Sequence, residues 1–106
     1  MEKMDWYPSS MSERLDFLLS NSDTIKAIAA RHKAISISVF GSVARGEDKP
    51  ESDVDFLVEF DRGVSVLDWV LLNEELEKFL NSKVDVVSMR GLKPRDIEIR
   101  KEAVLL

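Results

Sequence analysis

The sequence predicts an α/β (α+β) domain, built on a mixed β-sheet of three to four strands flanked by helices. Segments whose apolar residues alternate, as in strands, are interleaved with segments whose apolar residues recur at helical spacing. The 106 residues suffice for one domain with a modest core, and the apolar content of 44% is ordinary for a globular protein. No internal repeat or low-complexity tract suggests another architecture.

Composition restricts the classes of function. The chain has 20 acidic and 15 basic residues, and the basic ones are dispersed, which argues against a surface for DNA or RNA. It contains no cysteine, so disulfides and thiolate metal sites are excluded and a reducing compartment, the cytoplasm, is expected. No window approaches the roughly 18 uninterrupted apolar residues of a membrane helix. The first residues lead into no apolar run, so no signal peptide is expected.

Two helices are expected before the first strand. Ser10 to Glu13 has the form of a capping box, and apolar residues then recur at helical spacing up to Leu19. Asn21 to Asp23 breaks this pattern and supplies a new cap. The second helix is expected from about Asp23 to His32, with an inward face formed by Ile25, Ile28 and Ala29.

The first strand is expected from Ala34 to Phe40. The apolar residues Ile35, Ile37 and Val39 alternate with two serines, which is the pattern of a strand. Gly41 to Gly46 is expected to form a turn that can open a short helix, and the polar segment from Glu47 to Ser52 is expected to form a loop.

The second half of the chain repeats the alternation of strand and helix. Val54 to Phe60 predicts a second strand, and Ser65 followed by Asp68 predicts the start of a helix that continues to about Asn81. This helix has an apolar stripe expected in the core, formed by Trp69, Leu72, Leu76, Phe79 and Leu80. Lys83 to Ser88 predicts a third strand.

The C-terminal segment is expected to begin with a loop. Gly91 and Pro94 interrupt the pattern, and a last helix is expected to start near Pro94, which suits a first-turn position. Residues 103–106 either extend this helix or pair as a short strand, and both possibilities are kept.

The turn from Gly41 to Gly46 has the composition of a phosphate-binding turn. Glycine lets the backbone turn sharply and approach a ligand, and N–H groups exposed at such a turn favour an anion. Ser42 adds a hydroxyl, and Arg45 adds a fork of donors that matches phosphate oxygens. Considered alone, a turn of this kind more often simply connects two elements.

Asp53 and Asp55 are a second notable feature, because Asp is depleted in strands. On one strand face their Cα atoms lie roughly 6.5–7 Å apart, from a rise of about 3.3 Å per residue. Their carboxylates can therefore converge on a pair of metal ions. For this pair alone, a solvated strand face is the competing interpretation.

Asp85 lies in an apolar run, Val84 to Val87, on the third predicted strand. On a central strand its carboxylate would need a partner, such as a metal shared with Asp53 and Asp55, because a buried unpaired charge is costly. On an edge strand Asp85 would face water. Taken together, the three features form an ordered set of hard oxygen ligands, which favours magnesium and in-line displacement at phosphorus.

The sequence resembles, in three places, the signature of the DNA polymerase β-type nucleotidyltransferase superfamily: Gly41-Ser42 to Arg45-Gly46, Ser52-Asp53-Val54-Asp55 and Val84-Asp85-Val86. The small size resembles the minimal nucleotidyltransferase (MNT) branch and implies its small nucleotidyltransferase fold. The similarity covers about residues 24–106, which we expect to be the nucleotidyltransferase domain, and leaves residues 1–23 as an N-terminal extension and helix.

The resemblance implies a function for each matching residue. Nucleotide binding falls to Gly41, Ser42, Arg45, Gly46 and Ser52, with ATP as the substrate. Two Mg²⁺ ions would be held by the catalytic residues Asp53, Asp55 and Asp85. Asp85 would also help to deprotonate the attacking hydroxyl.

The minimal branch resembled here includes the antitoxins of HEPN/MNT toxin–antitoxin pairs, in which the MNT chain transfers AMP from ATP to a tyrosine of the HEPN ribonuclease. A HEPN-type toxin is therefore the expected partner, and a nucleic acid is disfavoured by the acidic charge. One alternative is transfer to a small-molecule hydroxyl, although the extra helical domain of aminoglycoside nucleotidyltransferases has no counterpart in these residues. Another is neutralisation of a partner by binding alone, against which an intact Asp set weighs.

Overall fold

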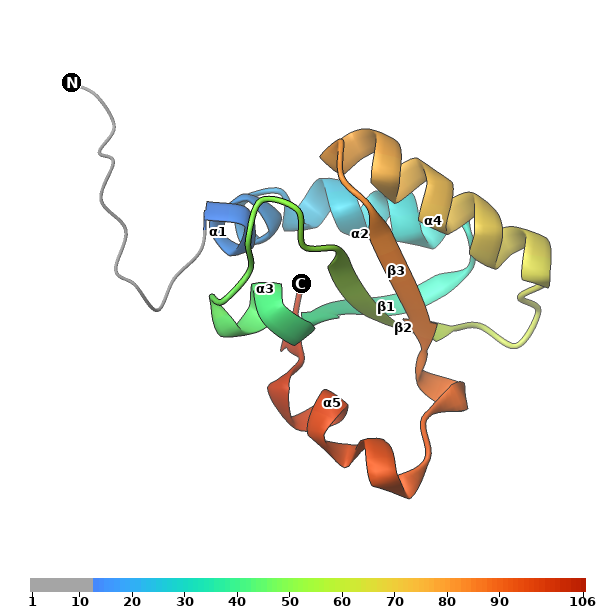
Figure 1. Ribbon diagram of the computed structural model, residues 1–106. Coiled ribbons are helices and arrows are strands. Elements are labelled where there is room, and N and C mark those ends of the chain that lie inside the picture. Colours follow the sequence, from blue (N-terminus) through green and yellow to red (C-terminus); the bar gives the residue numbers. More distant parts are fainter. Residues whose placement is uncertain (1–12) are drawn as a thin grey trace.

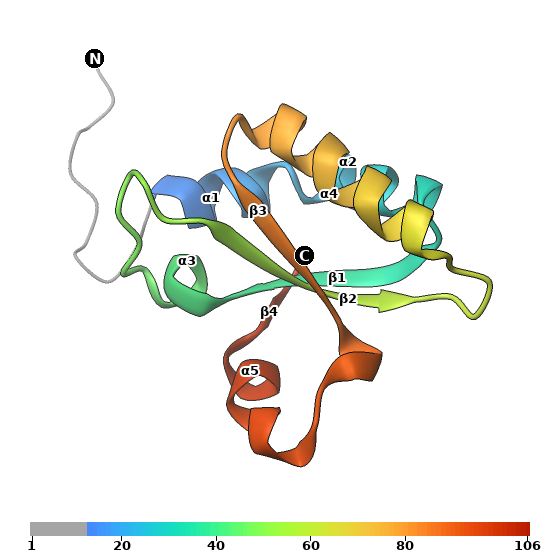
Figure 2. The same cartoon turned by 45° about the vertical axis from the view of Figure 1, so that its right-hand side comes forward.

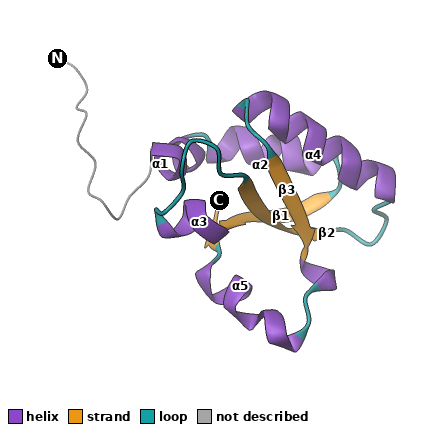
Figure 3. Cartoon of the chain, viewed as in Figure 1, coloured by secondary structure: helices purple, strands orange, loops and turns teal. Residues whose placement is uncertain are grey.

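A computed structural model describes residues 13–106 of the chain (Figure 1). The helices and strands, in order, are α1 (Glu13–Ser20), α2 (Ser22–Arg31), β1 (Ala34–Phe40), α3 (Gly41–Arg45), β2 (Val54–Phe60), α4 (Val66–Leu80), β3 (Val84–Ser88), α5 (Ile97–Glu102) and β4 (Val104–Leu105). Two 3₁₀ turns, Met89–Gly91 and Pro94–Asp96, join β3 to α5. Figure 3 shows how helices and strands alternate, and the predicted α/β class is confirmed.

One mixed sheet of four strands organises the domain, in the order β3-β2-β1-β4. β1 runs antiparallel to both β2 and β4, whereas β2 and β3 are parallel. The question left open for the tail is decided in favour of a strand, because Val104 pairs with Val39 of β1. Figure 2 shows α2 and α4 on one side of the sheet and α5 on the other.

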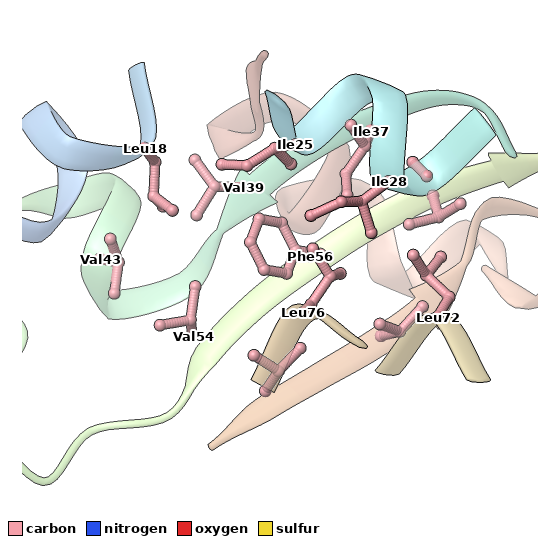
Figure 4. Packing of buried hydrophobic residues seen from close by; sticks show 14 of the residues in the cluster. Leu18, Ile25, Ile28, Ile37, Val39, Val43, Val54, Phe56, Leu72 and Leu76 are labelled. Atoms are coloured by element: carbon pink, nitrogen blue, oxygen red, sulfur yellow. The ribbon is translucent and has the colours of Figure 1, made fainter. Parts of the chain in front are cut away.

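The core lies between the sheet and the layer formed by α1, α2 and α4 (Figure 4). The predicted inward face of α2 is confirmed, since Ile25, Ile28 and Ala29 are buried. Alternate residues of β2 point into the same core, among them Phe56, which is fully buried. Each large apolar side chain buried in this way stabilises the fold by about 1.5–3 kcal/mol.

Two apolar residues of the predicted elements lie at the surface, and one of them, Trp69, was expected in the core. Ile35 is 62% exposed because the register between β1 and β2 shifts between Ala34 and Ser36, and such a bulge changes which way a side chain points. Trp69 is also exposed in part, although its ring packs on Phe60 with 6.1 Å between centroids. Its indole Nε1 donates a hydrogen bond of 2.9 Å to the Val86 carbonyl, so Trp69 covers the edge of the core rather than filling it.

The predicted helix start at Ser65 is confirmed as a capping box. The Ser65 hydroxyl accepts the Asp68 N–H, and the Asp68 carboxylate accepts the Ser65 N–H. The break between the first two helices falls at Asn21, as predicted. The proposed cap from Ser10 to Glu13 lies almost wholly outside the described residues. Within residues 13–106, every helix is too short or too polar to cross a bilayer.

Helix α1 holds the loop that precedes Asp53. The Arg14 guanidinium donates to the Asp48 carboxylate at 3.5 Å, to the Lys49 carbonyl at 3.1 Å and to the Ser82 hydroxyl. Leu18 of the same helix is buried in the core. These contacts integrate α1 with the loop and with the turn between α4 and β3.

Candidate active site

Asp55 is the central residue of the candidate site. It pairs in register with Phe40 at the end of β1 and with Asp85 on β3. Residues in register on parallel strands point to the same face of a sheet, about 4.8 Å apart. The sequence had suggested that Asp53 lies on the same strand as Asp55. β2 begins at Val54, so Asp53 lies immediately before the strand. Two neighbouring strands therefore bring the three Asp residues together.

β3 is the edge strand of the sheet, and Asp85 is exposed. The interpretation in which Asp85 sits on a central strand, buried and in need of a partner, is therefore wrong. The edge-strand interpretation is correct, but the parallel register still places Asp85 beside Asp55. Asp85 can be exposed and still lie beside Asp55, because within residues 13–106 no further strand covers the outer side of β3.

Gly41 passes directly against Asp55. Its φ of 75° lies in the left-handed region that favours glycine, and a Cβ at this position would overlap the Asp55 carboxylate. The turn after β1 thus requires glycine for both its conformation and its space. The first two chemical features predicted from the sequence meet at this contact.

Helix α3 presents the remaining residues of the turn. Val43 is fully buried and anchors the helix in the core. Gly46 ends the helix with a φ of 72°, and the N–H groups of Gly46 and Glu47 donate to the carbonyls of Val43 and Ser42 at 3.1 and 2.9 Å. Gly46 therefore has a structural role in this turn, and its assignment to nucleotide binding stays a prediction.

Ser52 closes the loop before Asp53. Its hydroxyl accepts the Lys49 N–H at 2.9 Å, and its own N–H donates to the Lys49 carbonyl at 2.9 Å. The loop is in this way shaped by Ser52, whose assignment to nucleotide binding also stays a prediction.

The acidic residues repel one another. Burial, and then the charges of Asp85, Asp53 and Glu102, raise the pKa of Asp55 above its ordinary value, and Arg45 offsets this only in part. The cluster therefore has more negative charge than its own basic neighbour neutralises.

The chemistry of the three Asp side chains suits a hard divalent cation. Asp53, Asp55 and Asp85 offer only carboxylate oxygens, which suit Mg²⁺, and a cation would relieve the repulsion that raises the pKa of Asp55. In residues 13–106, no three His, Cys, Asp or Glu side chains lie in a geometry that holds one metal ion. The assignment of the three Asp residues as metal ligands stays a prediction.

Glu102, at the end of α5, is a site residue that the sequence did not indicate. Its Oε2 accepts the Gly41 N–H at 2.9 Å, and its Oε1 accepts a hydrogen bond of 2.9 Å from Arg45 Nη1. Arg45 Nε also donates to Glu47 at 2.9 Å, and these two bonds, Glu47 first, raise the pKa of the guanidinium. No spacing pattern connects residues so far apart in the sequence, since only the pairing of β4 with β1 brings Glu102 to this place.

Similarity to known proteins agrees with this geometry. A family model described as nucleotidyltransferase domain matches residues 22–106. A Methanocaldococcus jannaschii protein assigned as a protein adenylyltransferase is 46% identical over 67 residues, covering 63% of this chain and 72% of its own. The protein adenylyltransferase MntA of Thermococcus cleftensis is 44% identical over 68 residues, covering 64% and 69%.

Solved structures share the fold. One assigned as a minimal nucleotidyltransferase superposes with a TM-score of 0.78 at 43% identity, over 93% of this chain and all (100%) of that chain. A tri-AMPylated Shewanella oneidensis HEPN toxin in complex with MNT antitoxin includes a chain with a TM-score of 0.61 at 20% identity, over 82% of this chain and 69% of that one. The second likeness establishes the fold alone. Because the family model matches most of the length of this chain, the chain belongs to the nucleotidyltransferase domain family.

Proposed function

We propose that this nucleotidyltransferase transfers AMP from ATP, with Mg²⁺, to a hydroxyl of a partner protein, with pyrophosphate as the leaving group. The observation that supports this most directly is the register of Asp55 with Asp85 beside the Gly41 turn. Carboxylates on two strands, next to donors suited to phosphate, are the groups that phosphoryl-type transfer requires.

Each part of the site has a role in this proposal. The Gly41 N–H, the Ser42 hydroxyl and the Arg45 guanidinium hold phosphate oxygens. Asp53 and Asp55 would hold Mg²⁺, which would supply charge stabilisation at the reacting phosphate. Asp85 accepts the proton of the attacking hydroxyl, a role suited to an exposed carboxylate that an incoming substrate can reach.

The acceptor side of the site is an open groove along the edge of the sheet. It has a volume of about 500 Å³ and lies between α4 and β3, lined by Val66, Trp69, Val70, Asn73, Glu74, Glu77, Asp85 and Val86. Val66 and Val70 are exposed, although they are apolar. An apolar wall with acidic residues beside Asp85 suits a protein surface that offers apolar and basic side chains around its hydroxyl.

The proposed partner is a HEPN-type toxin and the proposed hydroxyl is that of a tyrosine, with the chain acting as the antitoxin in the cytoplasm. Two similarities support this choice: the identity to a protein named protein adenylyltransferase MntA, and the fold shared with an MNT antitoxin complexed with an AMPylated HEPN toxin. Transfer requires two substrates held in line. A partner docked over the open edge of β3 would bring its hydroxyl to the site and enclose the reacting groups.

Co-expression with the adjacent gene product, followed by intact-mass spectrometry, tests the proposal. We expect the partner to gain the mass of one or more AMP units, and α-³²P-ATP with Mg²⁺ to label it in vitro. Asp55→Asn should abolish labelling, whereas Glu59→Gln, a carboxylate change further along the same strand face, should leave it intact. A partner that binds but stays unmodified would favour inhibition by binding alone. Labelling of an aminoglycoside or a similar compound, with no protein labelled, would favour a small-molecule acceptor.

A further inference from the structure

Glu102 occupies the donors that the proposed function assigns to the nucleotide. Its two carboxylate oxygens are divided between the Gly41 N–H and the Arg45 guanidinium, at 2.9 Å in both cases. Both bonds cross from α5 to α3, and they join the last helix of the chain to the turn beside Asp55.

We infer that Glu102 is a built-in competitor of the triphosphate, whose carboxylate must leave Gly41 and Arg45 before phosphate oxygens can bind there. The inference rests on the proposed function and adds a regulation of the same site. A carboxylate and a phosphate are both anionic oxygen acceptors, and one N–H group cannot donate fully to both. The Glu102 carboxylate and a phosphate bound to the same donors would also repel each other.

The geometry allows Glu102 to leave. The Glu102 side chain is 27% exposed, and α5 contributes no buried residue to the core. The short strand β4 and polar contacts of this kind hold the end of α5 in place. Elements with few buried apolar contacts open at low cost. Figure 2 shows α5 set apart from the helices that cover the opposite side of the sheet.

Departure of Glu102 would also reduce the crowding of negative charge. Glu102 is one of three carboxylates whose charges oppose ionisation of Asp55. A nucleotide that arrives with a divalent cation would replace this carboxylate with an anion whose charge is partly neutralised by that cation. The exchange therefore couples nucleotide occupancy to the position of the C-terminal segment.

The opposite hypothesis is that Glu102 positions Arg45 for the nucleotide. The two roles predict effects of opposite sign on affinity. If Glu102 competes, removing its charge strengthens nucleotide binding, because the fraction of molecules with a free site increases. If Glu102 positions Arg45, the same change weakens binding.

Calorimetric titration with a non-hydrolysable ATP analogue and Mg²⁺ distinguishes these roles. We expect Glu102→Gln to lower the Kd about tenfold, which corresponds to about 1.4 kcal/mol. Glu98→Gln is the matched control, because it removes the same charge at an exposed position one turn earlier in α5. It should bind like the wild type. An unchanged or higher Kd for Glu102→Gln, in a protein with wild-type circular dichroism, would overturn the inference.

A second measurement uses the unaltered chain. The sequence has four glycines, so the amide resonance of Gly41 is readily assigned in glycine-labelled protein. Saturating analogue should shift both this amide and the carboxyl carbon of Glu102, and a Glu102 resonance that stays fixed while Gly41 shifts would contradict the exchange. If the analogue binds to neither the wild type nor Glu102→Gln, the proposed function fails together with the inference. If it binds equally to both, only the inference fails.

Discussion

Asp55 and Asp85 stand in register on neighbouring parallel strands, although the whole of α4 separates them in the sequence. The consequence is a like-charge pair on one face of the sheet, in a position where only a cation or a proton relieves the repulsion. Such a pair is expected at a site where function, rather than stability, determines the residues.

Asp55→Asn should abolish nucleotide transfer and at the same time raise the melting temperature. A raised pKa means that the folded state binds the proton more tightly than the unfolded state does, so ionised Asp55 opposes folding once the pH exceeds its ordinary pKa of 3.8. Asparagine removes that charge. Label transfer and thermal unfolding at pH 7 without Mg²⁺ measure the two effects. A variant that melts below the wild type would contradict the stability argument, and one that transfers normally would contradict the catalytic assignment.

Gly41→Ala should impair both folding and nucleotide binding. The substitution adds a Cβ at a φ of 75°, against the Asp55 carboxylate. Left-handed backbone at a non-glycine residue costs roughly 1–3 kcal/mol, and the overlap adds to it. Chemical denaturation compares this variant with Gly91→Ala, where a Cβ meets nothing within 4 Å. We expect the control to stay within about 0.5 kcal/mol of the wild type. Equal stability of the two variants would be inconsistent with the close approach of Gly41 to Asp55.

Val70→Asp should weaken docking of the acceptor without changing affinity for ATP. Val70 lines the groove that contains Asp85, and a carboxylate there would break the apolar wall on which the partner protein is proposed to pack. The adjacent Leu71 is the matched control, because it is 40% exposed against 45% for Val70 but lines a different pocket, beside His32. The KM for the partner protein should rise at least about tenfold in Val70→Asp only. Equal effects of Val70→Asp and Leu71→Asp would refute this groove as the docking site.

Asp68→Asn should destabilise the fold at neutral pH, with an effect that disappears in acid. Hydrogen bonds, foremost that from the Ser65 backbone, lower the pKa of Asp68 below its ordinary value of 3.8. The stability that this carboxylate provides is therefore present above the unfolded pKa and is lost as the pH falls through the folded pKa. Denaturation curves from pH 7 to pH 3 should show the difference between variant and wild type shrinking. A difference that stays constant over that range would rule out the ionised capping box as its cause.

The local sequence determined most of the helices and strands and indicated two parts of the candidate site. Alternation predicted three strands, the Ser65 cap predicted the start of α4, and the glycine turn and Asp53 and Asp55 were recognised from residue type and spacing. The predictions of helices and strands succeed because backbone conformation and capping depend on residues close in the chain.

Only the tertiary structure decided which residues meet and which are exposed. A one-residue register shift put Ile35 at the surface, and the strand order placed Asp85 on an edge rather than in the interior. Glu102 joined the site only because β4 pairs with β1 and carries the end of α5 to Gly41. Strand order, register and contacts between distant residues depend on how the whole chain packs into one core, which no local pattern in the sequence specifies.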